Sequence, residues 1–246
     1  MRRKTFLFII FFLIYALSTT AEATDKKKES EYKVIEVTNG GSISGKAVFT
    51  GATVPNDEIL ILTSHQDVCG DTLPARKYLI NANREIRNVV VYLEGIKAGK
   101  EIPADPVIID NLICAFEPHV SIGYKGNMVL NRNSDPVLHG IQTMINGRFF
   151  YNISIPEKGF KQIEKKLIKA GLMAVKCYIH PWMVGYVYIF THPYAAVTDE
   201  KGEFSIGDIP SGSYEVKAWH EGFGEISLGK VTVAAGGAVI VNANFK

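Results

Sequence analysis

The chain has little cysteine and no excess of charge of either sign. Of its 246 residues only three are cysteine, and 27 Lys and Arg stand against 25 Asp and Glu. Residues 1–23 hold three of the basic and one of the acidic residues, so 24 of each remain in residues 24–246. This balance lacks the basic surplus that is typical of proteins that bind nucleic acid. We therefore expect no nucleic acid as a partner.

Several signatures of enzymes and haem proteins are also missing. The sequence contains no Cys-x-x-Cys-His, the motif for covalent haem attachment. It contains no Gly-x-Ser-x-Gly, no phosphate-binding loop and no His-Glu-x-x-His. Carboxylates such as Glu157, Glu164 and Glu221 are scattered in the manner of ordinary surface charge. The sequence therefore predicts a protein that is not an enzyme.

The N-terminal residues have the composition of an export signal. Basic residues 2–4 precede an apolar run over residues 5–17, and residues 21–23 have the Ala-x-Ala form of a cleavage site. The apolar run is about 13 residues long, where a membrane-spanning helix needs roughly 20, so an uncleaved anchor is the less favoured alternative. We predict a signal peptide over residues 1–23, a polar linker over 24–38, a periplasmic or otherwise exported protein, and no stable membrane span after cleavage.

Most of the remaining chain has strand character. Short runs rich in β-branched and aromatic residues are bounded by Gly, Pro, Asn or Asp, which is typical of strands; they include residues 43–49, 59–62, 89–93, 107–109, 174–176 and 187–190. One window, residues 160–170, places Ile163 and Leu167 on one helical face and lysines on the other. The sequence thus predicts an all-β protein with at most one short helix.

Residues with metal-binding chemistry concentrate in residues 177–183. Cys177, His180 and Met183 supply a thiolate, an imidazole and a thioether just before an apolar run. Completed by a second histidine, this is the ligand set of a blue-copper centre, in which two His and one Cys bind the metal and a Met makes a weak axial contact. If Cys177 binds a metal, Cys69 and Cys114 remain as the natural disulfide pair in an oxidising compartment. Two unpaired buried thiols are the alternative.

The segment before this loop resembles the cupredoxin family. Residues 133–139 read Asn-x-Asp-x-x-x-His, and in cupredoxins the histidine that ends this pattern is the first copper ligand. The resemblance covers about residues 105–190 and is strongest to amicyanin, because of the Cys-x2-His-x2-Met spacing. It implies one mononuclear Cu(I)/Cu(II) centre whose ligands are His139, Cys177, His180 and Met183.

One residue departs from the cupredoxin pattern. The residue after the first histidine ligand is usually small and polar and links the two ligand-bearing loops, whereas here it is Gly140. Asn131 and Asn133 are candidates to supply that link in its place, and a chain without such a link is the alternative. Trp182 is expected either to form part of a docking patch or to cap the core beneath the loop.

The C-terminal part resembles a second family. Residues 198–206 read Thr-Asp-x-x-Gly-x-Phe-x-Ile and residues 210–216 read Pro-x-Gly-x-Tyr-x-Val, as in the carboxypeptidase regulatory-like, or transthyretin-like, sandwich. We expect a hairpin over residues 196–206 with its turn at residues 199–202. Segments at 114–120, 180–183 and 192–199 also resemble exported proteins that are labelled methylamine-utilisation-like.

Together the two resemblances predict the architecture. We expect a cupredoxin-like Greek-key sandwich over residues 105–190, joined to or inserted in a transthyretin-like sandwich built from residues 39–104 and 191–246. His119 is expected to have a structural role, His65 is interpreted as a loop residue, and the roles of His192 and His220 stay open.

The resemblance also narrows the function. Multicopper oxidases and copper nitrite reductases place a histidine directly beside the ligand cysteine, whereas the neighbours of Cys177 are Lys176 and Tyr178. We therefore expect an exported, monomeric type 1 (blue) copper protein that carries single electrons to or from an exported redox partner. Two alternatives stay open. One is a copper-binding or delivery protein without redox turnover, and the other is a cell-envelope carbohydrate- or protein-binding module with a vestigial site.

Overall fold

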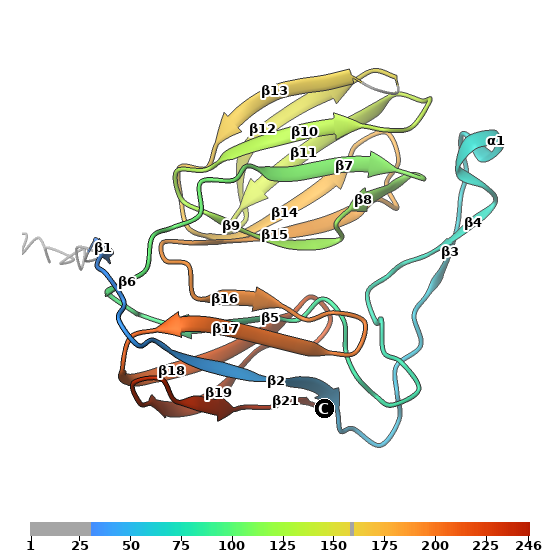
Figure 1. The fold of residues 1–246 in the computed structure, drawn as a ribbon. Helices are drawn as coiled ribbons and strands as arrows, with labels where there is room; N and C mark the ends of the chain where they lie inside the picture. Colours follow the sequence, from blue (N-terminus) through green and yellow to red (C-terminus); the bar gives the residue numbers. More distant parts are fainter. Residues whose placement is uncertain (1–30, 158–159) are drawn as a thin grey trace, which may run out of the picture. The chain divides into compact units, whose positions relative to one another are not determined.

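The computed structural model of the chain describes residues 31–157 and 160–246. The predicted signal peptide and residues 24–30 of the predicted linker lie outside the described residues. Nearly all regular structure in the described part is β, with one four-residue helix, so the predicted all-β class is confirmed (Figure 1). No helix there has the length and apolar composition that crossing a membrane requires.

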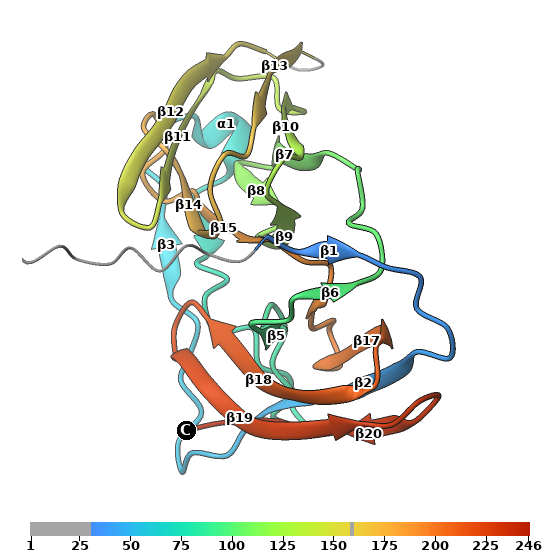
Figure 2. The ribbon, with the colours of Figure 1, turned by 90° about the vertical axis from the view of Figure 1, so that its left-hand side faces the viewer.

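One group of strands forms two sheets around a common core. Their orders are β16-β5-β18-β19 and β17-β2-β20, with β21 also paired to β2. Figure 2 shows β18 beside β19. The alternation along β2 follows from its sequence, because Ile43, Ala47 and Phe49 face the core and the residues between them are less buried. The strands are β2 (Gly41–Phe49), β5 (Val90–Glu94), β16 (Ala195–Val197), β17 (Glu203–Ile209), β18 (Gly212–His220), β19 (Gly224–Val233), β20 (Ala238–Ile240) and β21 (Ala243–Phe245).

The hairpin predicted over residues 196–206 is wrong, although its turn is present. β16 pairs with β5 and β17 pairs with β2, so the two strands belong to different sheets. The turn between them is held by Asp199, whose Oδ1 accepts the backbone N–H groups of Lys201 (2.8 Å) and Glu203 (2.9 Å). Gly202 has φ +66°, which glycine adopts without strain. The short sequence window contains the turn, but the core determines the partner of each strand.

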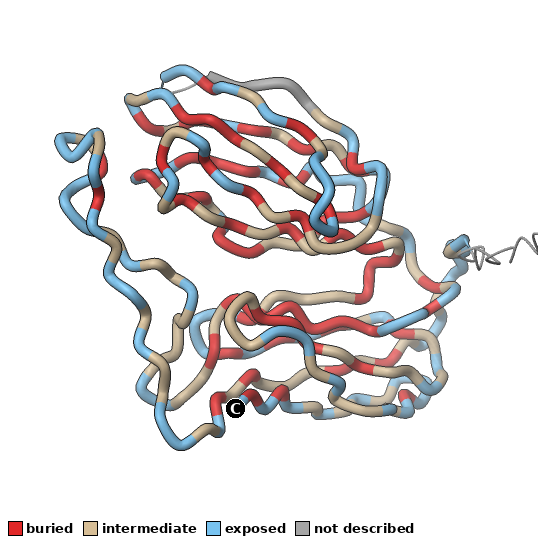
Figure 3. Tube along the Cα trace, turned by 180° about the vertical axis from the view of Figure 1, so that it is seen from behind, coloured by how far each residue is buried: buried red, intermediate tan, exposed pale blue. Residues whose placement is uncertain are grey.

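A second group of strands forms another two-sheet sandwich. The sheet orders are β13-β10-β7-β8 and β12-β11-β14-β15-β9, and apolar residues of both sheets share one core. Figure 3 shows buried segments along the strands of both groups. The strands are β7 (Val107–Leu112), β8 (Ala115–Glu117), β9 (Val120–Tyr124), β10 (Met128–Asn133), β11 (His139–Ile145), β12 (Arg148–Ile155), β13 (Phe160–Lys166), β14 (Gly171–Cys177) and β15 (Val184–Phe190).

The helix predicted over residues 160–170 is wrong. Phe160–Lys166 is strand β13, which pairs antiparallel with β10. The lysine-rich edge strand pairs one side of its backbone with β10, and such tertiary pairing overrides a weak helical pattern. Leu167, which the helical pattern placed on an apolar face, is fully buried beyond the end of the strand.

The segment between β2 and β5 forms an arm, which a disulfide closes against the turn between β7 and β8. It contains β3 (Ile59–Ile61) paired with β4 (Thr72–Pro74), with helix α1 (Gln66–Cys69) between them. Cys69 is bonded to Cys114, as the sequence predicts. A short parallel pair, β1 (Lys33–Val34) and β6 (Ala98–Gly99), completes the strands of the described residues.

The arm belongs to the core of the second sandwich. Its Leu62 and Cys69 are buried in the same cluster as Val107, Cys177 and Met183. In the sequence, however, the arm falls within residues 39–104, which we assigned to the transthyretin-like sandwich. The boundaries of the two predicted domains otherwise stay a prediction.

Candidate metal centre

Strand register brings the candidate ligands together. β11 begins at His139 and β14 ends at Cys177, and the two strands pair antiparallel with Ile141 opposite Cys177. The loop from β14 to β15 then carries His180 and Met183. Two backbone hydrogen bonds close this loop, from Cys177 N–H to the Met183 carbonyl (3.2 Å) and from Met183 N–H to the His180 carbonyl (3.0 Å).

Three donor atoms converge on one point. The Nδ1 atoms of His139 and His180 lie 3.0 Å apart, and Cys177 Sγ lies 3.9 Å from the first and 3.7 Å from the second. Nitrogen and sulfur ligands that sit about 2.0 to 2.3 Å from one metal ion have mutual separations of this size. All three side chains are buried. The residues present therefore fit a metal ion bound by two imidazoles and one thiolate.

The other nitrogen of His139 is tied to a carboxylate. His139 Nε2 lies 2.9 Å from Asp135 Oδ2, and the carboxylate also accepts backbone N–H groups of Ile113 (2.7 Å) and Cys114 (2.9 Å). With the Nε2 proton donated to Asp135, Nδ1 is the nitrogen that would bind a metal ion in place of a proton, and this is the tautomer that binding through Nδ1 needs.

These bonds shift both pKa values. Burial by itself lowers the pKa of His139, but hydrogen bonds to Asp135 and Cys177 outweigh it and raise the pKa above its ordinary value. Burial raises the pKa of Asp135, and the bonds from His139, Cys114 and Ile113 outweigh that effect and lower it.

The sulfur of Cys177 is surrounded by donors. Backbone N–H groups of Gly140 (3.4 Å) and His180 (3.3 Å) point at Sγ. Burial raises the pKa of the thiol, but the hydrogen bonds from the two histidines and the two backbone groups outweigh burial and lower the pKa from 9.0 to about 6. The thiolate, which is the form that binds metals, is therefore favoured near neutral pH.

Met183 and Trp182 border the centre. Met183 is 2% exposed and packs in the same core cluster as Cys177. Trp182 packs its ring against His180, with 5.0 Å between ring centroids, and donates from Nε1 to the Cys114 carbonyl (3.3 Å). Trp182 thus connects the ligand loop to the disulfide.

The link between the ligand loops is not made by Asn133, one of the two residues named for it from the sequence. Asn133 donates to the carbonyls of Val137, Ile155 and Pro156 and not to the cysteine loop. Gly140 itself makes the link, because its N–H donates to Cys177 Sγ and its carbonyl accepts from Tyr178 N–H (3.1 Å). A Cβ at Gly140 would lie 2.2 Å from the Tyr178 ring, so the departure from the cupredoxin pattern leaves room for this tyrosine.

The structure also brings His65 to the centre, where sequence reasoning saw only a loop residue. His65 Nδ1 lies 2.9 Å from Nε2 of His180. The available signal was its position four residues before Cys69, whose disulfide partner Cys114 precedes the cupredoxin-like pattern. His119 bonds to Glu221 instead, and neither His192 nor His220 belongs to the metal-type clusters found in the described residues.

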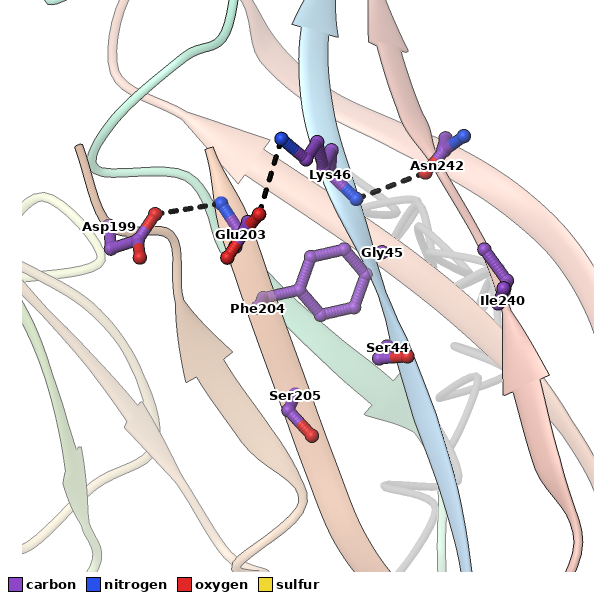
Figure 4. Close-up of a pocket in the computed structure, with 9 residues that line it drawn as sticks. All are labelled: Ser44, Gly45, Lys46, Asp199, Glu203, Phe204, Ser205, Ile240 and Asn242. Carbon is purple, nitrogen blue, oxygen red and sulfur yellow. Dashed lines mark hydrogen bonds and ion pairs between the residues drawn. The ribbon is translucent and has the colours of Figure 1, made fainter. Parts of the chain in front are cut away.

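A separate hollow of about 700 Å³ lies over β2 and β17, and none of the candidate ligands lines it (Figure 4). Several of its polar groups are engaged with one another. Lys46 pairs with Glu203 (3.2 Å), and Asn242 Oδ1 accepts the backbone N–H of Lys46 (3.0 Å). These pairings do not favour the hollow as a ligand site.

Comparison with known proteins agrees with the C-terminal resemblance. Residues 187–246 match the carboxypeptidase regulatory-like domain. The match covers about a quarter of the chain and begins inside β15 of the second sandwich. No curated protein matches the chain significantly in sequence.

Solved structures similar to this chain include several cupredoxins. An amicyanin variant in its reduced Cu(I) form is 16% identical, and the match covers 36% of this chain and 86% of amicyanin at a TM-score of 0.31. A purple cupredoxin from Nitrosopumilus maritimus is 24% identical over 34% of this chain and 98% of its own, at 0.29. A copper-containing nitrite reductase from Thermus scotoductus is 21% identical over 37% and 23%, at 0.30.

Proposed function

We propose that this chain is an exported mononuclear copper protein that carries single electrons between redox partners. The observation that supports the proposal is the convergence of His139 Nδ1, His180 Nδ1 and Cys177 Sγ within 3.0–3.9 Å of one another in a buried site. A copper ion bound there would supply a one-electron couple. Met183 is the proposed weak axial ligand.

The framework suits such a role. His139 and Cys177 come from paired strands, and His180 and Met183 come from the loop between β14 and β15, which is closed by its own backbone bonds. Donors held in this way move little when the charge of a bound ion changes, which keeps the barrier to electron transfer low. Two N–H groups directed at the thiolate stabilise its negative charge.

Burial favours electron transfer over the alternative of copper delivery. His139 and His180 are fully buried, and Cys177 and Met183 are nearly so. A delivery protein has to pass its ion to another ligand set, which requires access to the donors. In the described residues these four side chains are not accessible to another ligand set. We therefore rank copper delivery second.

The test is a Cu(II) titration of residues 24–246, followed by visible and paramagnetic-resonance spectroscopy. We expect one equivalent of copper to produce an intense thiolate-to-copper band with narrow copper hyperfine splitting. The variant Cys177→Ser should lose the band entirely, because serine cannot supply the thiolate. The matched variant Met183→Leu should keep it, because only the weak axial contact is removed.

Other outcomes would contradict the proposal in distinguishable ways. A copper complex without the intense band would move the assignment to copper handling. Failure to retain copper at all would favour a binding module with a vestigial site. A band that persists in Cys177→Ser would show that the thiolate is not the ligand responsible.

A further inference from the structure

The outer edge of the His180 ring is covered by another imidazole. His180 Nε2 lies 2.9 Å from His65 Nδ1, and the rings meet edge to face with 5.0 Å between centroids. His180 is fully buried, whereas His65 is exposed. The candidate ligand therefore has no contact with solvent, and His65 stands between it and the surface.

The arm holds His65 in this position by several independent bonds. The carbonyl of His65 accepts N–H groups from Val68 (3.0 Å) and Cys69 (2.7 Å), which starts helix α1. Leu62 anchors one side of the arm in the core, and the Cys69–Cys114 disulfide anchors the other. His65 itself has φ 50° and ψ 38°, in the left-handed region. A non-glycine residue there is uncommon, which indicates that the surroundings determine its conformation.

The bond has a defined direction if His180 uses Nδ1 for the metal. His180 Nδ1 faces Cys177 Sγ and His139 Nδ1, so its lone pair must stay free and the ring proton must sit on Nε2. That proton needs an acceptor, and the atom within reach is His65 Nδ1. The arrangement parallels His139, whose Nε2 proton is accepted by Asp135. Partners of this kind fix the tautomer and orientation of a ligand imidazole.

We propose that His65 is a positioning residue for His180, supplied by the disulfide-closed arm: it accepts the Nε2 proton and closes the outer edge of the ring to water. This inference rests on the proposed function in so far as His180 binds copper. A redox partner would then approach the centre through the exposed His65 and not through His180 directly.

Two substitutions separate the hydrogen bond from the backbone conformation. In His65→Asn, Oδ1 replaces Nδ1 as the acceptor, and Asn tolerates the left-handed region. In His65→Gly, the backbone is equally tolerated but the acceptor is gone. Both variants therefore tolerate the left-handed backbone conformation at position 65. They differ in whether a hydrogen-bond acceptor for His180 Nε2 is present, and the comparison measures the effect of that acceptor.

The first readout needs no copper. In the protein loaded with Zn(II), a diamagnetic ion that binds imidazole and thiolate ligands, nitrogen-15 NMR of the histidine rings should show His180 protonated at Nε2, with slow exchange of that proton with water. We expect the signal to persist in His65→Asn and to be lost through fast exchange in His65→Gly. A slowly exchanging Nε2 proton in His65→Gly would overturn the proposal, as would its loss in both variants.

The second readout is copper affinity, measured by competition with a chelator. Removing a hydrogen-bond partner of a metal ligand typically weakens affinity about 10- to 100-fold, so we expect that loss in His65→Gly and a loss of less than about threefold in His65→Asn. Equal affinity in both variants would overturn the positioning role. If the unmodified protein binds no copper, the proposed function fails, whereas the NMR result on the His65–His180 bond still stands by itself.

Discussion

Two pairs of buried histidines behave differently in this molecule. His139 and His180 are fully buried in the candidate metal centre, and His192 and His220 are nearly fully buried outside it. Burial lowers the pKa of His192 to about 4, and burial with the nearby His119 and Lys77 lowers that of His220 to about 4. For His139 the same burial is outweighed, and the pKa is raised.

The difference lies in what each Nδ1 atom meets. In His192 it accepts the backbone N–H of Tyr194 (3.3 Å), and in His220 that of Gly222 (3.1 Å). Those lone pairs are already used, and the rings serve as neutral parts of the packing. In His139 and His180 each Nε2 has a side-chain partner, which leaves Nδ1 directed at the thiolate. Burial alone therefore does not mark a candidate metal ligand, whereas convergence of a ring nitrogen with other donor atoms does.

The contrast between the two pairs of histidines predicts that the metal-free protein loses stability in acid, and this is the largest effect that we expect. With a pKa of about 6.5 when unfolded and about 4 when folded, His192 and His220 bind more protons in the unfolded state between these values. The free energy of unfolding should therefore fall as pH drops from 6.5 to 4, by up to about 3 kcal/mol for each residue. Urea unfolding at about pH 7 and about pH 4.5 measures the loss.

A double variant, His192→Asn with His220→Asn, serves as the control. Asn keeps an acceptor for the backbone N–H but does not titrate, so the slope of stability against pH should become shallower. An unchanged slope would show that other groups cause the acid sensitivity and that these two histidines are not held neutral by burial.

A smaller effect is expected from the carboxylate beside His139. In Asp135→Asn the charged acceptor of the His139 Nε2 proton is lost, and copper affinity should fall about 10- to 100-fold, which is about 1.4 to 2.7 kcal/mol. Competition titration measures it. The matched variant Asp199→Asn alters an exposed turn in the other sandwich and should leave copper affinity unchanged. Equal affinity in Asp135→Asn and the parent would show that the His139 tautomer is fixed by something else.

An effect of similar size, on stability and not on copper affinity, is expected at the glycine that links the ligand loops. In Gly140→Ala the new methyl group would meet the Tyr178 ring, and forced repacking of this kind costs about 1 to 3 kcal/mol of stability. A Cβ at Gly207 in β17 would meet no other atom within 4 Å, so Gly207→Ala should change stability by less than about 1 kcal/mol. Thermal unfolding of both variants provides the comparison, and equal stability would contradict close packing at Gly140.

Local sequence patterns predicted where strands lie better than they predicted which strands pair with each other. The runs at residues 43–49, 89–93 and 107–109 lie in or overlap β2, β5 and β7. The turn at Asp199 was also predicted, but its flanking strands join different sheets. Residues 160–170 carried a helical pattern that pairing with β10 overrides. Pairing depends on residues far away in the chain, and no short window contains that information.

The sequence alone was enough to infer three features: the all-β class, the pairing of Cys69 with Cys114, and the candidate ligands within one loop. Cys177, His180 and Met183 follow one another at intervals of three residues, so a single tight loop brings them together whatever surrounds it. His139 was expected to join them from its resemblance to the cupredoxin pattern, and the fold adds that its Nδ1 is the atom that faces Cys177. Two contacts could be learned from the folded chain alone: Gly140 links the loops, and His65 covers His180. Each of these contacts joins residues from 37 to 115 positions apart, and strand register and the disulfide-closed arm are what bring them within hydrogen-bonding distance.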